Sequence, residues 1–289
     1  MFQANLQGAA DRVQAHLTDV LLPLGNLPVI EAMRYASAGG KRLRAFLVLE
    51  SARLYGVPAE NAVWPAAAIE AMHAYSLVHD DLPCMDDDDM RRGLPTTHIK
   101  WDEATAVLAG DALQTFAFEL VTRPECHDDP AVRVELALTL SRAAGARGMV
   151  RGQALDIAAE TAPEPLTLDE ITDLQAGKTG ALIEWSAMAG AVMAQTDTAP
   201  MQAYASALGL AFQIADDILD VEGDAEKAGK RLQKDADAGK ATFVSLLGLD
   251  GAKTRAKQLV DEACAALGPF GEAGENLREA ARFVISRDS

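Results

Sequence analysis

The sequence lacks several features that mark common classes of protein. Its 289 residues include three cysteines, Cys84, Cys126 and Cys264, which lie far apart and form no CxxC pair. This pattern is typical of a reduced, cytoplasmic protein. No run of about 18 apolar residues is present to span a bilayer, and residues 1–22 lack the basic start and unbroken apolar core of a signal peptide. We therefore expect a cytoplasmic protein with no membrane partner.

Aromatic residues and flexible linkers are also scarce. Aromatic residues make up 5% of the chain, whereas the 49% hydrophobic fraction is rich in alanine and leucine. This composition suits closely packed helices rather than a β-sandwich. No stretch rich in proline, glycine and serine divides the chain, so residues 1–289 are predicted to form a single domain.

Apolar residues recur along most of the sequence with the spacing of a helix. Gly39-Gly40 and Pro83 separate helical segments, and Thr167 with Glu170 has the spacing of a capping box. No strand pattern or solenoid repeat is convincing. The sequence predicts an all-α bundle around a central active-site cavity. Helices are expected at residues 3–21, 27–37, 41–55, 60–82, 101–121, 130–148, 149–160, 168–190, 199–222, 241–248, 251–267 and 273–286.

The charge balance restricts the partners. The chain has 43 acidic and 26 basic side chains, which gives a formal net charge of −17. Such a charge disfavours nucleic acid and anionic membranes as partners. An anionic substrate would therefore need bridging metal ions and a local group of lysines and arginines.

Aspartates are concentrated in two clusters far apart in the chain. The first is Asp80-Asp81-Leu-Pro-Cys-Met-Asp86-Asp87-Asp88-Asp89 and the second is Asp216-Asp217-Ile-Leu-Asp220. Like charges at i,i+4 on a helix destabilise it by roughly 0.2–0.5 kcal/mol per pair, so such clusters call for nearby cations. Mg²⁺ typically takes one or two carboxylates and completes its shell with water and substrate phosphate. The clusters therefore predict divalent metal ions bound together with a diphosphate.

The second cluster has helical spacing. Gln213, Asp216, Asp217 and Asp220 follow the i, i+3, i+4, i+7 pattern of one helix face. A solvated acidic face is the alternative, but such a face would normally interleave lysine or glutamate. It would also not follow the apolar run Leu-Gly-Leu-Ala-Phe-Gln-Ile-Ala. We therefore interpret this face as a metal site.

The first cluster lies where a helix is expected to end. The negative end of the helix dipole favours cations near Asp80 and Asp81. Pro83 then turns the chain, which lets Asp86 return toward the same ion. A solvated acidic loop is the alternative interpretation of this segment, and it suffices for the aspartates at 87–89.

Basic residues recur beside glycines and beside the aspartates. Glycine lets backbone and ammonium groups approach an anion closely, and arginine offers a fork to phosphate oxygens. Each stretch alone is compatible with an ordinary surface, but together they suit a substrate pair with two anionic groups. His73 lies two helical turns before Asp80, where a packed or a substrate-binding histidine fits equally. The basic stretches are Gly39-Gly40-Lys41-Arg42-Leu43-Arg44, Arg91-Arg92, Gly177-Lys178-Thr179-Gly180, Lys230-Arg231 and Gly239-Lys240.

Four segments, taken in chain order, resemble the motifs of the trans-isoprenyl diphosphate synthases, and most closely those of the bacterial farnesyl diphosphate synthases. They are residues 39–44, residues 73–93 with the first aspartate cluster, residues 177–180, and residues 212–220 with the second cluster. The resemblance covers roughly residues 30–250. It implies an isoprenoid-synthase-type helical bundle and a homodimer. It also implies a prenyltransferase of isoprenoid biosynthesis, which condenses isopentenyl diphosphate head-to-tail with dimethylallyl or geranyl diphosphate to give (2E,6E)-farnesyl diphosphate.

The resemblance also implies roles for individual residues. Three Mg²⁺ ions, for which Mn²⁺ is an expected substitute, would be held by Asp80, Asp81, Asp86, Asp216, Asp217 and Asp220. Isopentenyl diphosphate would bind Gly40, Lys41, Arg44, His73 and Arg92. The allylic diphosphate would bind Arg91, Lys178, Lys230 and Lys240. Thr179 and Gln213 would stabilise the allylic cation with their oxygen dipoles.

The length of the product can be argued from helix geometry. The growing tail would run from Asp80 back along its own helix, where one turn rises about 5.4 Å, close to one isoprene unit. Tyr75 and Ser76 lie one turn down, so the large ring at 75 would close the pocket early. Ordinary core packing of Tyr75 is compatible with this role. We expect a C15 product, with a C20 geranylgeranyl diphosphate synthase as the alternative.

Other functions fit the sequence less well. A terpene cyclase or head-to-head synthase needs no isopentenyl diphosphate site, so the basic stretch 39–44 and Arg92 argue against it. A non-catalytic subunit of a prenyl synthase would be expected to have lost aspartates. A Ca²⁺-binding helical protein would need EF-hand spacing, which is missing. Members of the family often end in a basic tail that closes over the site, but this chain offers only Arg287, so the sequence leaves closure by the tail open. The apolar residues 104–118 suggest a subunit interface.

Overall fold

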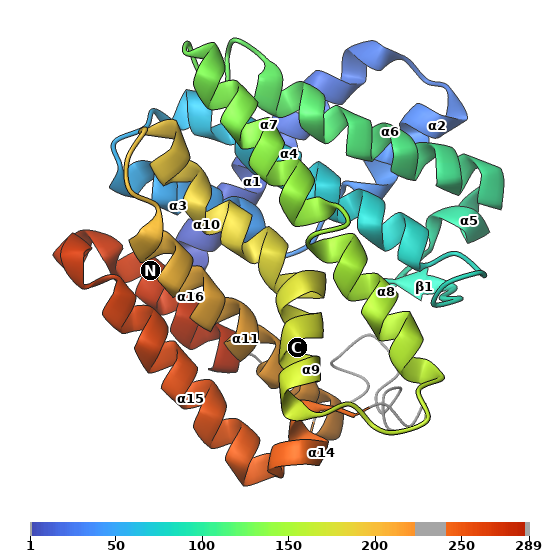
Figure 1. The fold of residues 1–289 in the computed structure, drawn as a ribbon. Helices are drawn as coiled ribbons and strands as arrows, with labels where there is room; N and C mark the ends of the chain where they lie inside the picture. Colours follow the sequence, from blue (N-terminus) through green and yellow to red (C-terminus); the bar gives the residue numbers. More distant parts are fainter. Residues whose placement is uncertain (1, 223–240, 287–289) are drawn as a thin grey trace. The chain divides into compact units, whose positions relative to one another are not determined.

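The computed structural model describes residues 2–222 and 241–286. These residues form helices joined by short connections, with one hairpin of two-residue strands (Figure 1). The predicted all-α class is confirmed. The chain groups into two compact units, residues 1–137 with 192–195 and residues 138–191 with 196–289. That residues 1–289 act as a single domain stays a prediction.

The first unit is built on a central helix. This is α4 (Ala59–Asp80), whose alanine-rich middle, including Ala66, Ala67 and Ala71, is fully buried. A helix that is apolar on most of its surface belongs in the interior. It packs along α6 and α3 and against α1. The other elements are α1 (Phe2–Leu21), η1 (Leu22–Leu24), α2 (Pro28–Ala36), α3 (Leu43–Leu54), β1 (Met90–Arg91), β2 (Leu94–Pro95), α5 (Thr97–Lys100), α6 (Glu103–Thr122) and part of α7 (Pro130–Ala144).

The second unit is built on α11 (Ala199–Glu222), which packs along α15 (Leu249–Ala266) and against α16 (Glu275–Ser286) (Figure 1). The predicted capping box of Thr167 and Glu170 is confirmed at the start of α9 (Leu168–Gln175). The remaining elements are α8 (Met149–Glu160), η2 (Ala176–Gly180), α10 (Ala181–Met193), α14 (Phe243–Leu247) and η3 (Gly268–Gly274).

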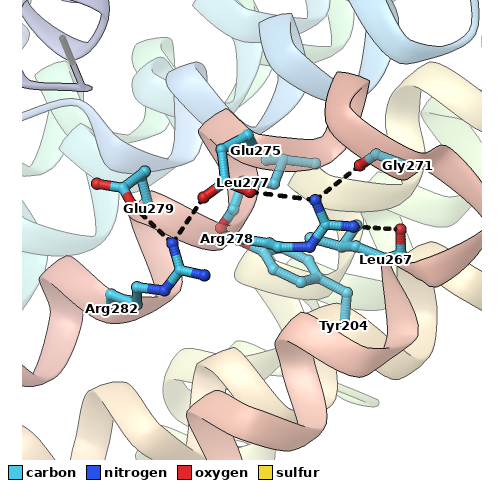
Figure 2. Close-up of polar contacts among 8 residues, drawn as sticks. All are labelled: Tyr204, Leu267, Gly271, Glu275, Leu277, Arg278, Glu279 and Arg282. Atoms are coloured by element: carbon cyan, nitrogen blue, oxygen red, sulfur yellow. Dashed lines mark hydrogen bonds and ion pairs between the residues drawn. The ribbon is translucent and has the colours of Figure 1, made fainter.

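The last helix of the second unit is held by three side chains (Figure 2). The buried Tyr204 hydroxyl of α11 donates to the carbonyl of Leu277 at 2.8 Å. Arg278 donates to the carbonyls of Leu267 and Gly271 at 2.8 and 2.7 Å. Arg282 pairs with Glu275 and Glu279. Tyr204 therefore fastens α16 to α11, and Arg278 satisfies two carbonyls at and after the end of α15, whereas the pairs of Arg282 lie within α16.

Three local predictions were wrong. Residues 90–95 form an antiparallel hairpin in which Arg91 pairs with Leu94, whereas no strand was expected. The single helix predicted at 168–190 is interrupted by η2, a π-helical turn. The helix predicted at 130–148 ends at Ala144, because the chain turns between Gly145 and Gly148.

One helix of the described ranges, α6, is long and apolar enough to cross a membrane by length and composition. Its residues Ala106, Ala109, Leu113 and Leu120 are fully buried, and it packs along α4. This is how the core helix of a globular unit behaves.

Candidate active site

The first aspartate cluster begins where α4 ends. Asp80 is the last residue of the helix and Asp81 is its C-cap, so both lie at the negative end of the helix dipole. The following segment folds back, because the Asp86 N–H donates to the carbonyl of Asp80 at 2.8 Å and the Asp88 N–H to that of Asp81 at 3.2 Å. The turn expected at Pro83 therefore returns Asp86 to the end of α4.

Asp81 is paired with Arg91. Arg91 Nε lies 2.8 and 2.9 Å from the two carboxylate oxygens of Asp81, and Nη2 lies 2.5 Å from Oδ1. Burial raises the pKa of the Asp81 carboxyl, and the hydrogen bonds from Arg91 oppose this rise. Burial alone would lower the pKa of Arg91, but Asp81 and Asp88 raise it on balance. The pair is a charge-assisted, bidentate contact, and it holds Arg91 at the end of α4.

The hairpin at 90–95 presents Arg92. Arg92 and Gly93 have φ values of 53° and 76°, as in the type I′ turn that favours glycine at its second position. The Arg92 guanidinium lies against Gly40, where an added Cβ would be 2.9 Å from Arg92 Cζ, and Gly40 itself has a φ of +83°. Only glycine fits this close approach without strain. Gly40 and Arg92, which are both predicted to bind isopentenyl diphosphate, are therefore in contact.

His73 lies among arginines. Burial lowers the pKa of His73 well below its ordinary value, and the charges of Arg44, Arg92, Arg91 and Arg42 lower it further. The imidazole is therefore neutral at pH 7 and offers one donor and one acceptor. We call Arg44, Arg91 and Arg92, which lie around the neutral His73, the cationic cluster. Lys41 is exposed in the loop beside it.

An amphipathic cavity of about 300 Å³ lies beside the hairpin in the first unit. Gly39, Gly40, Asp81, Arg91 and Arg92 give it a polar side. A cavity of this kind suits a small ligand with an anionic head and an apolar body. Its apolar side is formed by Tyr35, Ala36, Ala74, Leu77, Val78, Leu94 and Pro95.

The residues proposed to set product length lie on α4. Tyr75 is buried, and its ring meets the imidazole of His79 edge-on with centroids 5.6 Å apart. His79 Nε2 is in turn 3.0 Å from the carbonyl of Val107 on α6. Ser76 Oγ donates to the carbonyl of His73 at 2.9 Å. The Tyr75 ring is therefore supported from both α4 and α6.

In the second unit, Gln213, Asp216, Asp217 and Asp220 all lie on α11 and are half-buried, so the predicted helical spacing is confirmed. Asp217 Oδ2 accepts a hydrogen bond of 2.7 Å from the N–H of Phe243, the first residue of α14.

Lys178 and Thr179 lie in the π-helical turn η2, a feature that is often found at functional sites. Lys178 Nζ lies 2.6 Å from Asp156 Oδ2 on α8. Gln213 Nε2 donates to Gln175 Oε1 at 2.5 Å. The second unit therefore places a predicted diphosphate-binding lysine in η2, and a predicted cation-stabilising glutamine against Gln175, the residue that precedes η2.

Lys230 and Lys240, predicted to bind the allylic diphosphate, and Arg287 of the tail lie outside the described residues. Sequence reasoning also missed two buried or half-buried carboxylates, Glu70 and Asp156. Asp156 pairs with the predicted site residue Lys178, whereas Glu70 contacts Arg42 and Ala45 in the segment that carries the predicted residues Lys41 and Arg44. Glu70 carried a usable signal, because it is the one charged residue between Glu60 and His73 in an apolar helix. Such a residue needs a buried partner.

In residues 2–222 and 241–286, no group of three or more histidines, cysteines, aspartates or glutamates is arranged to hold a metal ion. The donors still fit Mg²⁺. Asp80 and Asp86 are neighbours at a helix C-terminus, and a Mg²⁺ ion takes only one or two carboxylates beside water and phosphate. Asp81 fits less well, since Arg91 occupies both of its oxygens.

Comparison with known proteins identifies the family. The polyprenyl synthetase family model matches residues 28–270. The chain is 45% identical to the farnesyl diphosphate synthase of Escherichia coli over 92% of both proteins. It is 37% identical to a chloroplastic geranylgeranyl pyrophosphate synthase of Catharanthus roseus over 100% of this chain and 82% of that protein. The crystal structure of an FPP/GFPP synthase from Zymomonas mobilis matches with a TM-score of 0.89 and 45% identity over 98% of both chains. The chain belongs to the polyprenyl synthetase family.

Proposed function

We propose that this protein is a farnesyl diphosphate synthase. It condenses isopentenyl diphosphate head-to-tail with dimethylallyl and then geranyl diphosphate to give (2E,6E)-farnesyl diphosphate. The observation that carries the proposal is the cationic cluster beside an aspartate cluster at the end of α4, in a chain 45% identical to a farnesyl diphosphate synthase.

Isopentenyl diphosphate is bound by Gly40, Lys41, Arg44, His73 and Arg92. The contact of Gly40 with Arg92 and the arginines around His73 support this assignment. Arginine forks match phosphate oxygens, and a neutral imidazole can donate one hydrogen bond to such an oxygen. A terpene cyclase would not need this second anion site.

The allylic diphosphate is bound by Arg91, Lys178, Lys230 and Lys240. Mg²⁺ would be held by Asp80, Asp86, Asp216, Asp217 and Asp220, and by Asp81 where one of its oxygens is released from Arg91. We assign three Mg²⁺ ions to the site, replaceable by Mn²⁺. When bound, Mg²⁺ would neutralise charge on the diphosphate and so assist its departure. The pairing of Lys178 with Asp156 supports its part in this site, because it fixes the ammonium group.

In the proposed reaction, the site residues stabilise the charges that form as the allylic diphosphate ionises. The allylic C–O bond breaks and its electron pair leaves with the diphosphate, whose charge is taken up by Arg91 and Lys178. Thr179 and Gln213 turn oxygen dipoles toward the allylic carbon. The double bond of isopentenyl diphosphate forms the new C–C bond, and a proton passes to a diphosphate oxygen, because no side-chain base is evident. The apolar surroundings keep out water, which would capture the cation.

Tyr75 limits the product to C15 in this proposal. Its buried ring, held by His79, supports the role. The similarity to a geranylgeranyl pyrophosphate synthase keeps a C20 product as the second candidate. A non-catalytic prenyl synthase subunit is disfavoured, because both aspartate clusters are complete.

We further propose that the protein is a cytoplasmic homodimer. Val107 and Leu108 of α6 are 40% and 57% exposed, as expected for an apolar face covered by a second copy. The molar mass of the protein in solution would test whether it is a dimer.

The function is tested with geranyl diphosphate and radiolabelled isopentenyl diphosphate, with Mg²⁺ or with an excess of a chelator. The proposal expects label in a prenyl product only when Mg²⁺ is present. Conversion of the allylic diphosphate to a hydrocarbon without incorporation of label would indicate a cyclase. No turnover of either substrate would favour the regulatory subunit.

A further inference from the structure

The loop between α2 and α3 carries Gly40 and Lys41 and has an unusual backbone. Gly39, Gly40 and Arg42 have φ values of +73°, +83° and +50°. Arginine rarely adopts this left-handed region, because its Cβ meets the following carbonyl. Such a conformation persists only where the surroundings hold it, so the partners of Arg42 decide the shape of the loop.

Arg42 is buried and anchors this loop. It is 5% exposed, and its Nη2 donates to the carbonyl of Ser37 and to Oε1 of Gln14, both at 2.6 Å. The bond to Ser37 closes the loop across its two ends. The bond to Gln14 fastens it to α1.

Gln14 makes a second contact with the loop. Its Oε1 also accepts the N–H of Gly39 at 3.2 Å. One side-chain oxygen on α1 therefore holds both the glycine before Gly40 and the arginine after Lys41.

Glu70 of α4 completes the arrangement. Its Oε1 accepts the N–H of Ala45 in the first turn of α3 at 2.9 Å, and its Oε2 lies 3.7 Å from Arg42 Nη1. Burial lowers the pKa of Arg42 and of Arg92, and the Glu70 carboxylate opposes both changes. Glu70 is thus a buried counter-charge beside the cationic cluster, where arginines would otherwise repel one another.

We propose that Gln14, Arg42 and Glu70 are positioning residues that pre-organise the loop at 37–42 for diphosphate binding. None of the three needs to touch the ligand. They hold the backbone so that Gly40, Lys41 and Arg44 face one anion. The identity of the ligand as isopentenyl diphosphate rests on the proposed function.

A loop that is not fixed in advance must be ordered when the ligand binds, and this cost weakens binding. Variants that lack these positioning contacts should therefore bind isopentenyl diphosphate more weakly, which raises its KM. The KM for geranyl diphosphate should not change, because its predicted ligands are other residues. A merely destabilised protein would instead lose active molecules, which lowers kcat and leaves both KM values unchanged.

The test compares Gln14→Ala with Gln7→Ala. Gln7 is on the same helix, is exposed, and donates to Asp11 of that helix at 2.8 Å, so Gln7→Ala should behave as wild type. Removal of a charge-assisted hydrogen bond costs enough for Gln14→Ala to raise the KM for isopentenyl diphosphate about tenfold. Gln14→Glu keeps the acceptor oxygen and should recover most of this loss.

Glu70→Gln provides a second measurement. The amide can still accept the Ala45 N–H but carries no charge, so the KM for isopentenyl diphosphate should rise here too, with the thermal midpoint recorded for each variant. Equal KM values in Gln14→Ala and Gln7→Ala, or parallel changes for both substrates, would overturn the proposal.

If the proposed function is wrong, the wild-type protein will condense no substrates, and this outcome is distinct from a failure of the positioning role. In that case, calorimetric binding of inorganic diphosphate is compared in the same variants. Weaker binding in Gln14→Ala than in Gln7→Ala supports the positioning role, and equal binding overturns it.

Discussion

Lys178 Nζ lies 2.6 Å from Asp156 Oδ2, so an ammonium group predicted to bind diphosphate is held by a carboxylate of the neighbouring helix. Gly152 permits this, because a Cβ there would collide with the backbone of Lys178. The ion pair is partly buried, with the lysine side chain 29% and the aspartate side chain 15% exposed. The contact therefore orients Lys178 more than it stabilises the fold.

Asp156→Asn should weaken the allylic site. The amide keeps the shape but removes the charge that orients Lys178, so kcat/KM for geranyl diphosphate should fall about tenfold, with the KM for isopentenyl diphosphate unchanged. Asp173→Asn is the matched control, because Asp173 forms an exposed pair with Arg151 of the same helix α8. Equal kinetics in the two variants would contradict the role of Asp156.

Asp80→Ala and Asp216→Ala should each lower kcat by about a thousandfold or more at saturating Mg²⁺, since each removes a proposed ligand of the ions that assist departure of the diphosphate. Circular dichroism should show an unchanged helix content. Asp89→Ala, in the same acidic segment but not assigned to the site, is the control. Near-normal rates in either test variant would refute the metal-site assignment.

Tyr75→Ala should lengthen the product by at least one isoprene unit. Removal of the buried ring opens the space one helical turn below Asp80, and one turn rises about 5.4 Å. The measurement is the chain length of the dephosphorylated products. An unchanged C15 product would place the floor of the pocket elsewhere.

Gly110→Ala should shift product length in the same direction, although less. A Cβ at Gly110 would collide with the His79 imidazole, which supports the Tyr75 ring and contacts the carbonyl of Val107. Displacement of His79 frees Tyr75 to move. Gly8→Ala on α1, where an added Cβ meets nothing within 4 Å, should leave the product distribution unchanged. The idea fails if Gly110→Ala and Gly8→Ala give the same products.

His73 should make stability depend on pH. Its folded pKa is lowered from 6.5 by burial and by the arginines around it, so the unfolded chain binds the proton more readily. The contribution is complete above the unfolded value and is lost as pH falls through 6.5 toward the folded pKa. His73→Asn should therefore lose less thermal stability than wild type between about pH 8 and pH 5. Equal losses would show that His73 titrates normally.

Much of the fold could be predicted from the sequence, because its signals are local. Leu6, Val13 and Leu17 mark one face of α1, and all three are buried. The hairpin at 90–95 was missed because strands of two residues have no periodicity, although Arg92-Gly93 fits a type I′ turn. The π-helical turn was missed because a local change in hydrogen bonding leaves the apolar pattern of 168–190 intact.

The candidate site, like the fold, could be predicted only in part from the sequence. Motifs that repeat charge or glycine, such as Asp80-Asp81 and Gly39-Gly40, are visible in sequence. The residues that hold them are not, since Gln14 and Asp156 reach their partners through the tertiary fold. A single glutamine or aspartate on an ordinary helix carries no sign of such a contact.

The most direct test of the account is the product formed by wild-type protein from dimethylallyl diphosphate and excess isopentenyl diphosphate with Mg²⁺, analysed as the dephosphorylated alcohols. The account predicts farnesol. Geranylgeraniol would leave the enzyme class intact and contradict the role of Tyr75. No elongation from dimethylallyl or geranyl diphosphate would contradict the proposed function itself.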